Sequence, residues 1–299
     1  MVRRFIQPAC QIPELVMMTH KSAPFRSLAS LASSCLIEEV NLTPKPGLVD
    51  RRGRGSHTDL TVDLMERSAR TLESSFAEIA RESWGQKIDV RLREAIGAIG
   101  REGEKHMLQA TGGINTHRGA LWVLGLLVSA VASGKNTDTV GEIFRKAAAL
   151  SCLPDRAADK IIQGKESHGL RAKRLFKMPG AREEAQNGFP HIARKALPAL
   201  YESRKRGISE THARLNALLA IMTTLSDTCV LTRSGPEGLL RMHSLASQTL
   251  FAGGMGTVNG EEKFFQLDAA MHEMNASPGG AADLLAGTLF LDQLPGLIL

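Results

Sequence analysis

Residues 111–120, TGGINTHRGA, combine a glycine pair with three polar side chains, Asn115, His117 and Arg118. Glycines leave backbone N–H groups open, and the positive end of a following helix favours an anion, so this segment suits a phosphate. Arg118 adds a planar fork that can bind phosphate through two hydrogen bonds. A tight loop before a buried helix explains the glycines but not the three polar residues together. The residues expected to form a phosphate cradle are Gly112, Gly113, Asn115 and Arg118.

This loop differs from the common phosphate-binding motifs. The GxxxxGK[ST] spacing of a P-loop is missing, and no strand precedes the glycines as a Rossmann fingerprint requires. The phosphate interpretation therefore depends on the residue types alone.

A second segment, residues 38–50, places two carboxylates before a proline–glycine turn. Glu38 and Glu39 end a predicted helix, where negative charge opposes the macrodipole and a bound cation would offset the cost. The turn then presents Lys45 and Asp50. A solvated helix end and a structural turn explain this segment equally well when it is taken alone.

The loop GSHTD, residues 55–59, brings His57 next to Asp59, and Ser56 or Thr58 is expected to cap the next helix. Asp59, Asp63 and Glu66 follow an i, i+4, i+7 spacing that would place them on one helical face. Carboxylates and phosphate oxygens are ligands that Mg²⁺ prefers. A solvated acidic helix start is the better interpretation for Asp63 and Glu66, whereas both interpretations stay open for Asp59.

Two later segments also carry polar groups among apolar residues. Residues 226–235, SDTCVLTRSG, contain Asp227 and Arg233, which are expected beside a loop. Residues 275–286, NASPGGAADLLA, contain Pro278 at an expected helix start, with Asp283 one turn inside. The spacing does not say what Asp283 binds.

Most of the chain has the periodicity of amphipathic helices, and strand-like alternation is nearly absent. Aromatic residues make up only 4% of the sequence, which also disfavours sheets. We predict an all-α fold: a single-domain helical bundle with active-site loops between helices. The domain is expected over residues 27–299, and residues 1–26 remain unassigned. The expected helices are 27–40, 58–84, 89–107, 118–132, 141–150, 182–186, 192–201, 210–224, 236–250, 260–275 and 280–289.

The formal charge of +6 suits nucleic acid, an anionic membrane surface or a polyphosphate ligand. The basic residues recur in short clusters, and each cluster alone is best explained as a solvated face. The most apolar run, 120–132, is too short to span a bilayer, and no apolar signal region follows Arg3 and Arg4. Four widely spaced cysteines without CxxC suggest neither a disulfide framework nor a zinc site, so a cytoplasmic location is expected.

Taken together, the segments TPKPGLVD, GSHTD, TGGINTHRGA, SHG followed by GAREEA and GFP, SDTCVLTRSG and NASPGGAADLLA resemble the triphosphoribosyl-dephospho-coenzyme A synthases. The resemblance runs from about Ser27 to Asp283. It implies an all-helical enzyme that transfers the 5-triphosphoribosyl group of ATP to the 2′-hydroxyl of 3′-dephospho-CoA, releasing adenine. The product is the precursor of the prosthetic group of malonate decarboxylase or citrate lyase, and we favour malonate decarboxylase. Cys229 and Ser234 stand where the family often has asparagine and a glycine.

The resemblance implies a site that holds two polyanions and removes one proton. Glu38, Asp59 and Asp227 are expected to hold Mg²⁺ or act as the base, with His57 as a lesser candidate for the base. The residues expected to bind ATP phosphates are Lys45, Arg118 and Arg233. The partners considered are a downstream carrier-protein transferase and a second copy of the chain, with neither nucleic acid nor membrane expected.

Two other function classes fit part of the sequence. A helical metal-dependent nucleotide hydrolase would use the same histidine and aspartates as metal ligands. A basic nucleic-acid-binding protein would explain the charge, but the sequence has no recognisable recognition module and few aromatic residues.

Overall fold

The computed structural model describes residues 24–134, 138–161 and 174–294. Within these ranges the chain forms helices and loops without a named strand, and an isolated bridge joins Asp50 and Gly53. The all-α prediction is confirmed. The motif SHG at residues 167–169 lies outside the described residues, as does most of the unassigned segment 1–26.

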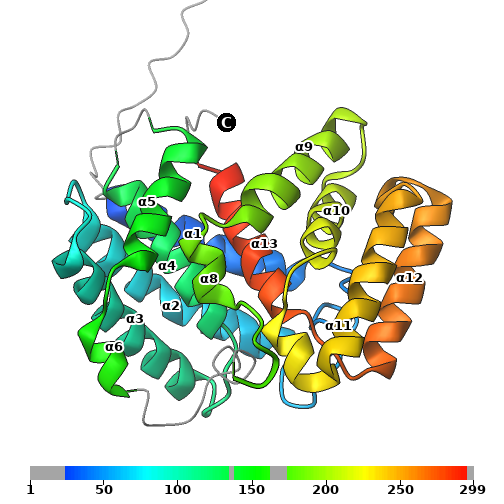
Figure 1. Cartoon of the computed structure of the whole chain (residues 1–299), viewed down its shortest axis with the longest axis horizontal. Helices are drawn as coiled ribbons and strands as arrows, with labels where there is room; N and C mark the ends of the chain where they lie inside the picture. Colours follow the sequence, from blue (N-terminus) through cyan, green and yellow to red (C-terminus); the bar gives the residue numbers. More distant parts are fainter. Residues whose placement is uncertain (1–23, 135–137, 162–173, 295–299) are drawn as a thin grey trace, which may run out of the picture.

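The helical elements follow one another along the chain, and the long loop 42–61 connects the first two of them (Figure 1). Their bounds are α1 Pro24–Asn41, α2 Val62–Ser83, α3 Val90–Ala110, α4 Arg118–Ala132, α5 Val140–Cys152, α6 Arg156–Ile161, α8 Ala181–Gln186, the π-helix η1 Ile192–Ala196, α9 Leu197–Lys205, α10 Glu210–Met222, α11 Thr228–Phe251, the 3₁₀-helix η2 Gly254–Gly256, α12 Val258–Glu273 and α13 Gly279–Asp292.

Helices α1 and α13 cross the middle of the molecule, with α2 to α8 on one side and α9 to α12 on the other (Figure 1). Helix α13 packs against α1, α4 and α10. Leu124 and Leu127 of α4 and Leu285 and Leu289 of α13 have no exposed surface. A helix that is apolar all round is buried on all sides, which fits both α4 and α13. No helix in the described ranges is long and apolar enough to cross a bilayer.

The start of α2 differs from the prediction. Thr61 is the N-cap, and its hydroxyl accepts a hydrogen bond from the Leu64 amide at 3.2 Å. Ser56 and Thr58 therefore do not cap this helix; the Ser56 hydroxyl instead donates to the carbonyl of Met271 at 3.3 Å. Asp59 lies in the preceding loop, so it does not share a helical face with Asp63 and Glu66.

Helix α11 also begins earlier than the predicted 236–250. Asp227 caps it, and the helix continues to Phe251 through a kink at Gly235, where φ is +68°, followed by Pro236. Arg233 therefore lies in the first turns of a helix, just before the kink, and its position is fixed by that backbone.

Candidate active site

A pocket of about 280 Å³ lies where the end of α1, the loop 42–61, and the starts of α4, α11 and α13 meet. Three helix N-termini thus converge on one space, and helix N-termini favour anions. The predicted site residues that line this pocket are Lys45, His57, Asp59, Asn115, Arg118 and Arg233. The predicted residues that do not line it are Glu38, Gly112, Gly113 and Asp227.

The structure does not bring Glu38, Asp59 and Asp227 together as a shared metal site. The Glu38 carboxylate accepts hydrogen bonds from Arg214 at 2.8 Å and from Gln293 at 2.9 Å. Within the described residues no group of three or more His, Cys, Asp or Glu side chains could hold a metal ion. Of the three predicted carboxylates the structure places only Asp59 at the pocket, and Glu39 of α1 lines the pocket where Glu38 does not.

Asp227 has a structural task that occupies its carboxylate. One oxygen accepts the amides of Cys229 at 2.9 Å and Val230 at 3.3 Å, and the other accepts the amide of Ala281 at 2.9 Å. Burial raises the pKa of Asp227 to about 6, although these amides lower it. Asp227 therefore joins the starts of α11 and α13 behind the pocket wall.

Lys45 is one of the largest fully buried side chains in the described part of the molecule. Its ammonium donates to Oε1 and to the backbone carbonyl of Glu39, both at 2.6 Å, and both side chains are nearly inaccessible to solvent. Lys45 still lines the pocket, so it presents charge from within the wall rather than from an exposed turn. Glu38 and not Glu39 was selected from the sequence. Both are glutamates, so residue type alone could not show that Glu39 is the one that lines the pocket.

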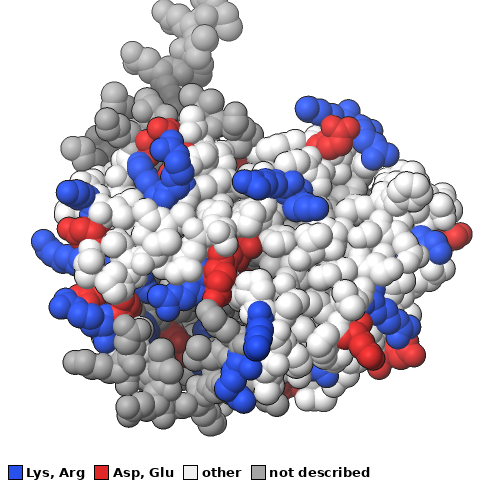
Figure 2. Space-filling model, viewed as in Figure 1, with Lys and Arg blue, Asp and Glu red and all other residues white. Residues whose placement is uncertain are grey.

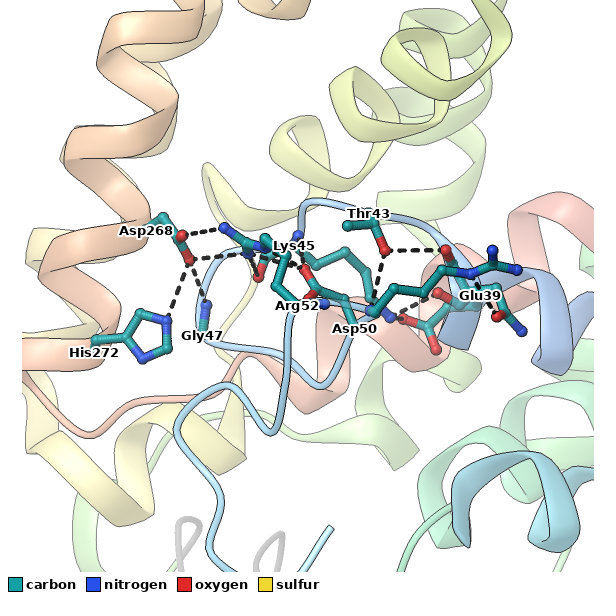
Figure 3. Close-up of polar contacts among 10 residues, drawn as sticks. Glu39, Thr43, Lys45, Gly47, Asp50, Arg52, Asp268 and His272 are labelled. Atoms are coloured by element: carbon teal, nitrogen blue, oxygen red, sulfur yellow. Dashed lines mark hydrogen bonds and ion pairs between the residues drawn. The ribbon is translucent and has the colours of Figure 1, made fainter. Parts of the chain in front are cut away.

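The loop that carries Lys45 is fixed by a second set of charged contacts (Figure 3). Asp50 accepts the Lys45 amide at 2.7 Å and Nε of Arg52 at 2.9 Å. Arg52 reaches Asp268 of α12 at 2.6 Å, and the Gly47 amide donates to Asp268 at 3.2 Å. Gly47 has φ +65°, and a Cβ there would clash with the backbone of Ala276. The loop is thus held against α12 and the start of α13.

His57 is held by two neighbours. Nη2 of Arg233 lies 3.0 Å from its Nδ1, and the Ser277 hydroxyl lies 2.9 Å from its Nε2. Because a guanidinium only donates, Nδ1 must accept and Nε2 must carry the proton. Burial and the charge of Arg233 lower the pKa of His57 to about 4. His57 therefore stays neutral near pH 7 and orients Arg233, and it has no free nitrogen to act as a base.

The structure brings two of the four predicted cradle residues, Asn115 and Arg118, to the pocket. The Gly112 and Gly113 amides donate to the carbonyls of Gln109 at 3.4 Å and Leu108 at 2.7 Å, so they end α3 and do not face a ligand. Asn115 accepts the Arg118 amide at 3.2 Å. The Arg118 guanidinium is half-exposed at the pocket and pairs with Glu104.

Two pocket residues were not selected from the sequence. His117 is the N-cap residue of α4 and is 3% exposed; burial and the charge of Lys45 lower its pKa to about 3. Asp283 packs so closely on Gly119 that an added Cβ would overlap its carboxylate. Burial and two nearby carboxylates raise the pKa of Asp283 well above its ordinary value, although the Ala120 amide opposes this. The sequence feature that could have identified Asp283 is an acidic residue within an otherwise apolar helix.

Comparison with known proteins identifies the family of this chain. The family model described as ATP:dephospho-CoA triphosphoribosyl transferase matches residues 25–298. The chain belongs to this family. A Klebsiella pneumoniae relative named 2-(5″-triphosphoribosyl)-3′-dephosphocoenzyme-A synthase is 56% identical over 93% of this chain and 98% of its own. A Pseudomonas fluorescens relative, named as a probable enzyme of the same type, is 50% identical over 89% of this chain and 91% of its own.

One solved structure, of a protein from Archaeoglobus fulgidus, aligns with 75% of this chain and 95% of its own at 20% identity, with a TM-score of 0.47. The family match, together with the 56% identical relative, makes the chain a transferase by its family.

The two departures from the triphosphoribosyl transferase motif lie in different surroundings. Cys229 lines the pocket, with its sulfur close to Gly279. Ser234 does not line it, and its hydroxyl donates to the Val230 carbonyl at 3.0 Å within α11. Only the cysteine can therefore contact a ligand in this pocket directly.

Replacing Lys45 by methionine tests the buried ion pair. Lys45→Met leaves the Glu39 charge buried without a partner, so we expect a loss of about 3–5 kcal/mol in the free energy of unfolding. The double variant Lys45→Met/Glu39→Leu should recover most of this loss. Lys105→Met is the matched control, because its pair with Glu102 is exposed, and it should cost less than about 1 kcal/mol. Denaturant unfolding measures all three; equal losses for Lys45→Met and Lys105→Met would contradict the buried pair.

Proposed function

We propose that this chain transfers the 5-triphosphoribosyl group of ATP to the 2′-hydroxyl of 3′-dephospho-CoA, with adenine as the leaving group. Family membership and a 56% identical relative matched over almost its full length support this reaction. The observation that carries the proposal is one pocket in which Arg118, Arg233 and Lys45 bring positive charge to groups that can exchange protons. Two polyanionic substrates need such charge in order to meet in one space.

The triphosphate is proposed to lie at the N-terminus of α4, against Arg118. The helix dipole and the guanidinium would both favour an anion there. Arg233 lies across the pocket and is oriented by His57. Holding both substrates in a reactive geometry can supply roughly 7–11 kcal/mol in well-oriented model systems.

Magnesium is proposed to bind with the triphosphate, not in a preformed protein site. Mg²⁺ usually keeps several waters and binds one or two carboxylates together with substrate phosphates. Asp59 fits this role because its carboxylate is half-exposed and lines the pocket.

The downstream use of the product follows from the same proposal. The triphosphoribosyl-dephospho-CoA product would be handed to a carrier-protein transferase that serves malonate decarboxylase or citrate lyase, and we favour malonate decarboxylase. Residues 27–299 are proposed to act as one domain.

The two rival functions receive less support. A metal-dependent hydrolase would need a cluster of ligands that the described residues do not provide. A nucleic-acid-binding protein would need a continuous basic surface. Figure 2 shows Lys and Arg interspersed with Asp and Glu over the described part of the face it presents.

The reaction is tested by incubating the protein with ATP and 3′-dephospho-CoA and analysing the products by mass spectrometry. We expect free adenine and a triphosphoribosyl adduct of dephospho-CoA in equal amounts, with no adenine when dephospho-CoA is omitted. Release of phosphate or pyrophosphate without an adduct would instead establish a hydrolase.

The magnesium proposal predicts different effects for two neighbouring aspartates. Asp59→Asn should raise the Mg²⁺ concentration needed for half-maximal activity by roughly tenfold, since one charged ligand is lost. Asp63→Asn is the control, because Asp63 is exposed on α2 and does not line the pocket. Full turnover of the wild type in excess chelator would contradict a metal requirement.

Arg118→Lys tests the position of the triphosphate. The change keeps the charge but loses the planar fork. The loss of one charge-assisted hydrogen bond, about 1.5–3 kcal/mol, should weaken ATP binding roughly ten- to a hundredfold. Calorimetric titration with ATP and the melting temperature are measured together. Unchanged affinity would place the triphosphate elsewhere, and a collapse in melting temperature would make Arg118 a structural residue.

A further inference from the structure

His117 carries a polar atom with no partner at a buried position beside the pocket. Its Nε2 makes no hydrogen bond to any described residue, although the side chain is 97% buried and lines the pocket. Buried polar atoms in native proteins are nearly always satisfied, so an exception calls for an explanation. A ligand that enters the pocket would supply the missing partner.

The imidazole ring is held firmly on its other side. The Ser68 hydroxyl lies 2.8 Å from Nδ1 and 2.6 Å from the Thr116 hydroxyl. The His117 backbone amide donates to the sulfur of Met107 at 3.3 Å. When Nδ1 carries the proton and donates to Ser68, the lone pair of Nε2 faces the pocket. The same contact survives protonation of Nε2, because Ser68 continues to accept.

The other buried titratable groups of this region are already engaged or unsuited to accept a proton, and the half-exposed Asp59 is proposed above to bind Mg²⁺. Glu39 is paired with Lys45, and the Asp227 carboxylate accepts backbone amides. Burial raises the pKa of Asp283 well above its ordinary value, and its carboxyl group is hydrogen-bonded to the Ala120 amide. His57, as shown above, has both nitrogens occupied.

We propose, on the basis of the triphosphoribosyl transfer proposed above, that His117 Nε2 accepts the proton of the dephospho-CoA 2′-hydroxyl during the reaction. The O–H bond breaks and its proton moves to Nε2, while the hydroxyl oxygen bonds to ribose C1′ of ATP. The C1′–N9 bond breaks, and its electron pair leaves with adenine, which takes a proton from solvent. His117 then returns its own proton to solvent, so protons and charge balance.

The charges around His117 suit this role. Lys45 from the loop 42–61 faces the ring and disfavours its protonated form. Glu39 of α1 and Asp283 of α13 line the same pocket, whereas α2 and α3 contribute the uncharged Ser68 and Met107. A bound triphosphate brings negative charge that raises the pKa of His117 from about 3 toward the neutral range, where a general base is most effective.

The test uses His117→Ala and His117→Gln in the full chain, with His106→Ala as control because His106 is exposed on α3 and outside the pocket. We expect both His117 variants to lower kcat roughly 10²- to 10⁴-fold, while Kd values for ATP and dephospho-CoA change less than about threefold. Added imidazole should restore part of the His117→Ala rate, and more basic imidazoles should restore more. A structural role would not give this dependence.

Full turnover of a folded His117→Ala variant would overturn the assignment, as would a rate loss explained by weaker substrate binding. If neither variant folds, the wild-type kcat between pH 4 and pH 9 decides. It should fall at low pH as His117 becomes protonated, and a flat profile would overturn the proposal. A wild type that releases no adenine would refute the transfer reaction itself, and this outcome is distinct from either result for His117.

Discussion

The buried ion pair between Lys45 and Glu39 is the interaction on which the rest of the site depends. Two charges removed from water are stable only when their geometry is close to ideal and their other hydrogen bonds are made. Here the ammonium meets both the carboxylate and the main-chain carbonyl of Glu39 at the end of α1. Removing either partner would leave the other charge buried in the pocket wall without a counter-ion. The pair therefore holds the loop 42–61, which carries Lys45, against the end of α1.

The remaining contacts of that loop hold it in the same position. Asp50, Arg52 and Asp268 tie the loop to α12, while Asp227 ties the start of α11 to the start of α13. Behind them, the fully buried helices α4 and α13 lie side by side, with Gly119 allowing the Asp283 carboxylate to reach the first turn of α4. A rigid wall of this kind holds catalytic groups in place before substrate arrives, which is how positioning lowers a barrier.

The sequence predicted the helices well and the site only in part. Helical periodicity located α1 and α2 because each buries one face, and the long apolar run 120–132 located α4. Asn115 and Arg118 could be placed near the pocket from the sequence because they stand between a glycine pair and the start of an apolar helix. Glu38 was chosen over Glu39 because residue type cannot show which of two neighbours on a helix faces inward. The glycine pair suggested amides open to a phosphate, whereas the amides of Gly112 and Gly113 bond to carbonyls at the end of α3.

His117 could not have been assigned without the fold. Its unpaired Nε2 is visible only when Ser68, 49 residues away along the chain, is known to occupy the other nitrogen. A crystal structure of the protein with ATP and dephospho-CoA bound is the most direct test of this pocket. The account predicts the triphosphate against Arg118 at the start of α4, with the 2′-hydroxyl within hydrogen-bonding distance of His117 Nε2. Both nucleotides bound outside the space between α1, α4, α11 and α13 would contradict it.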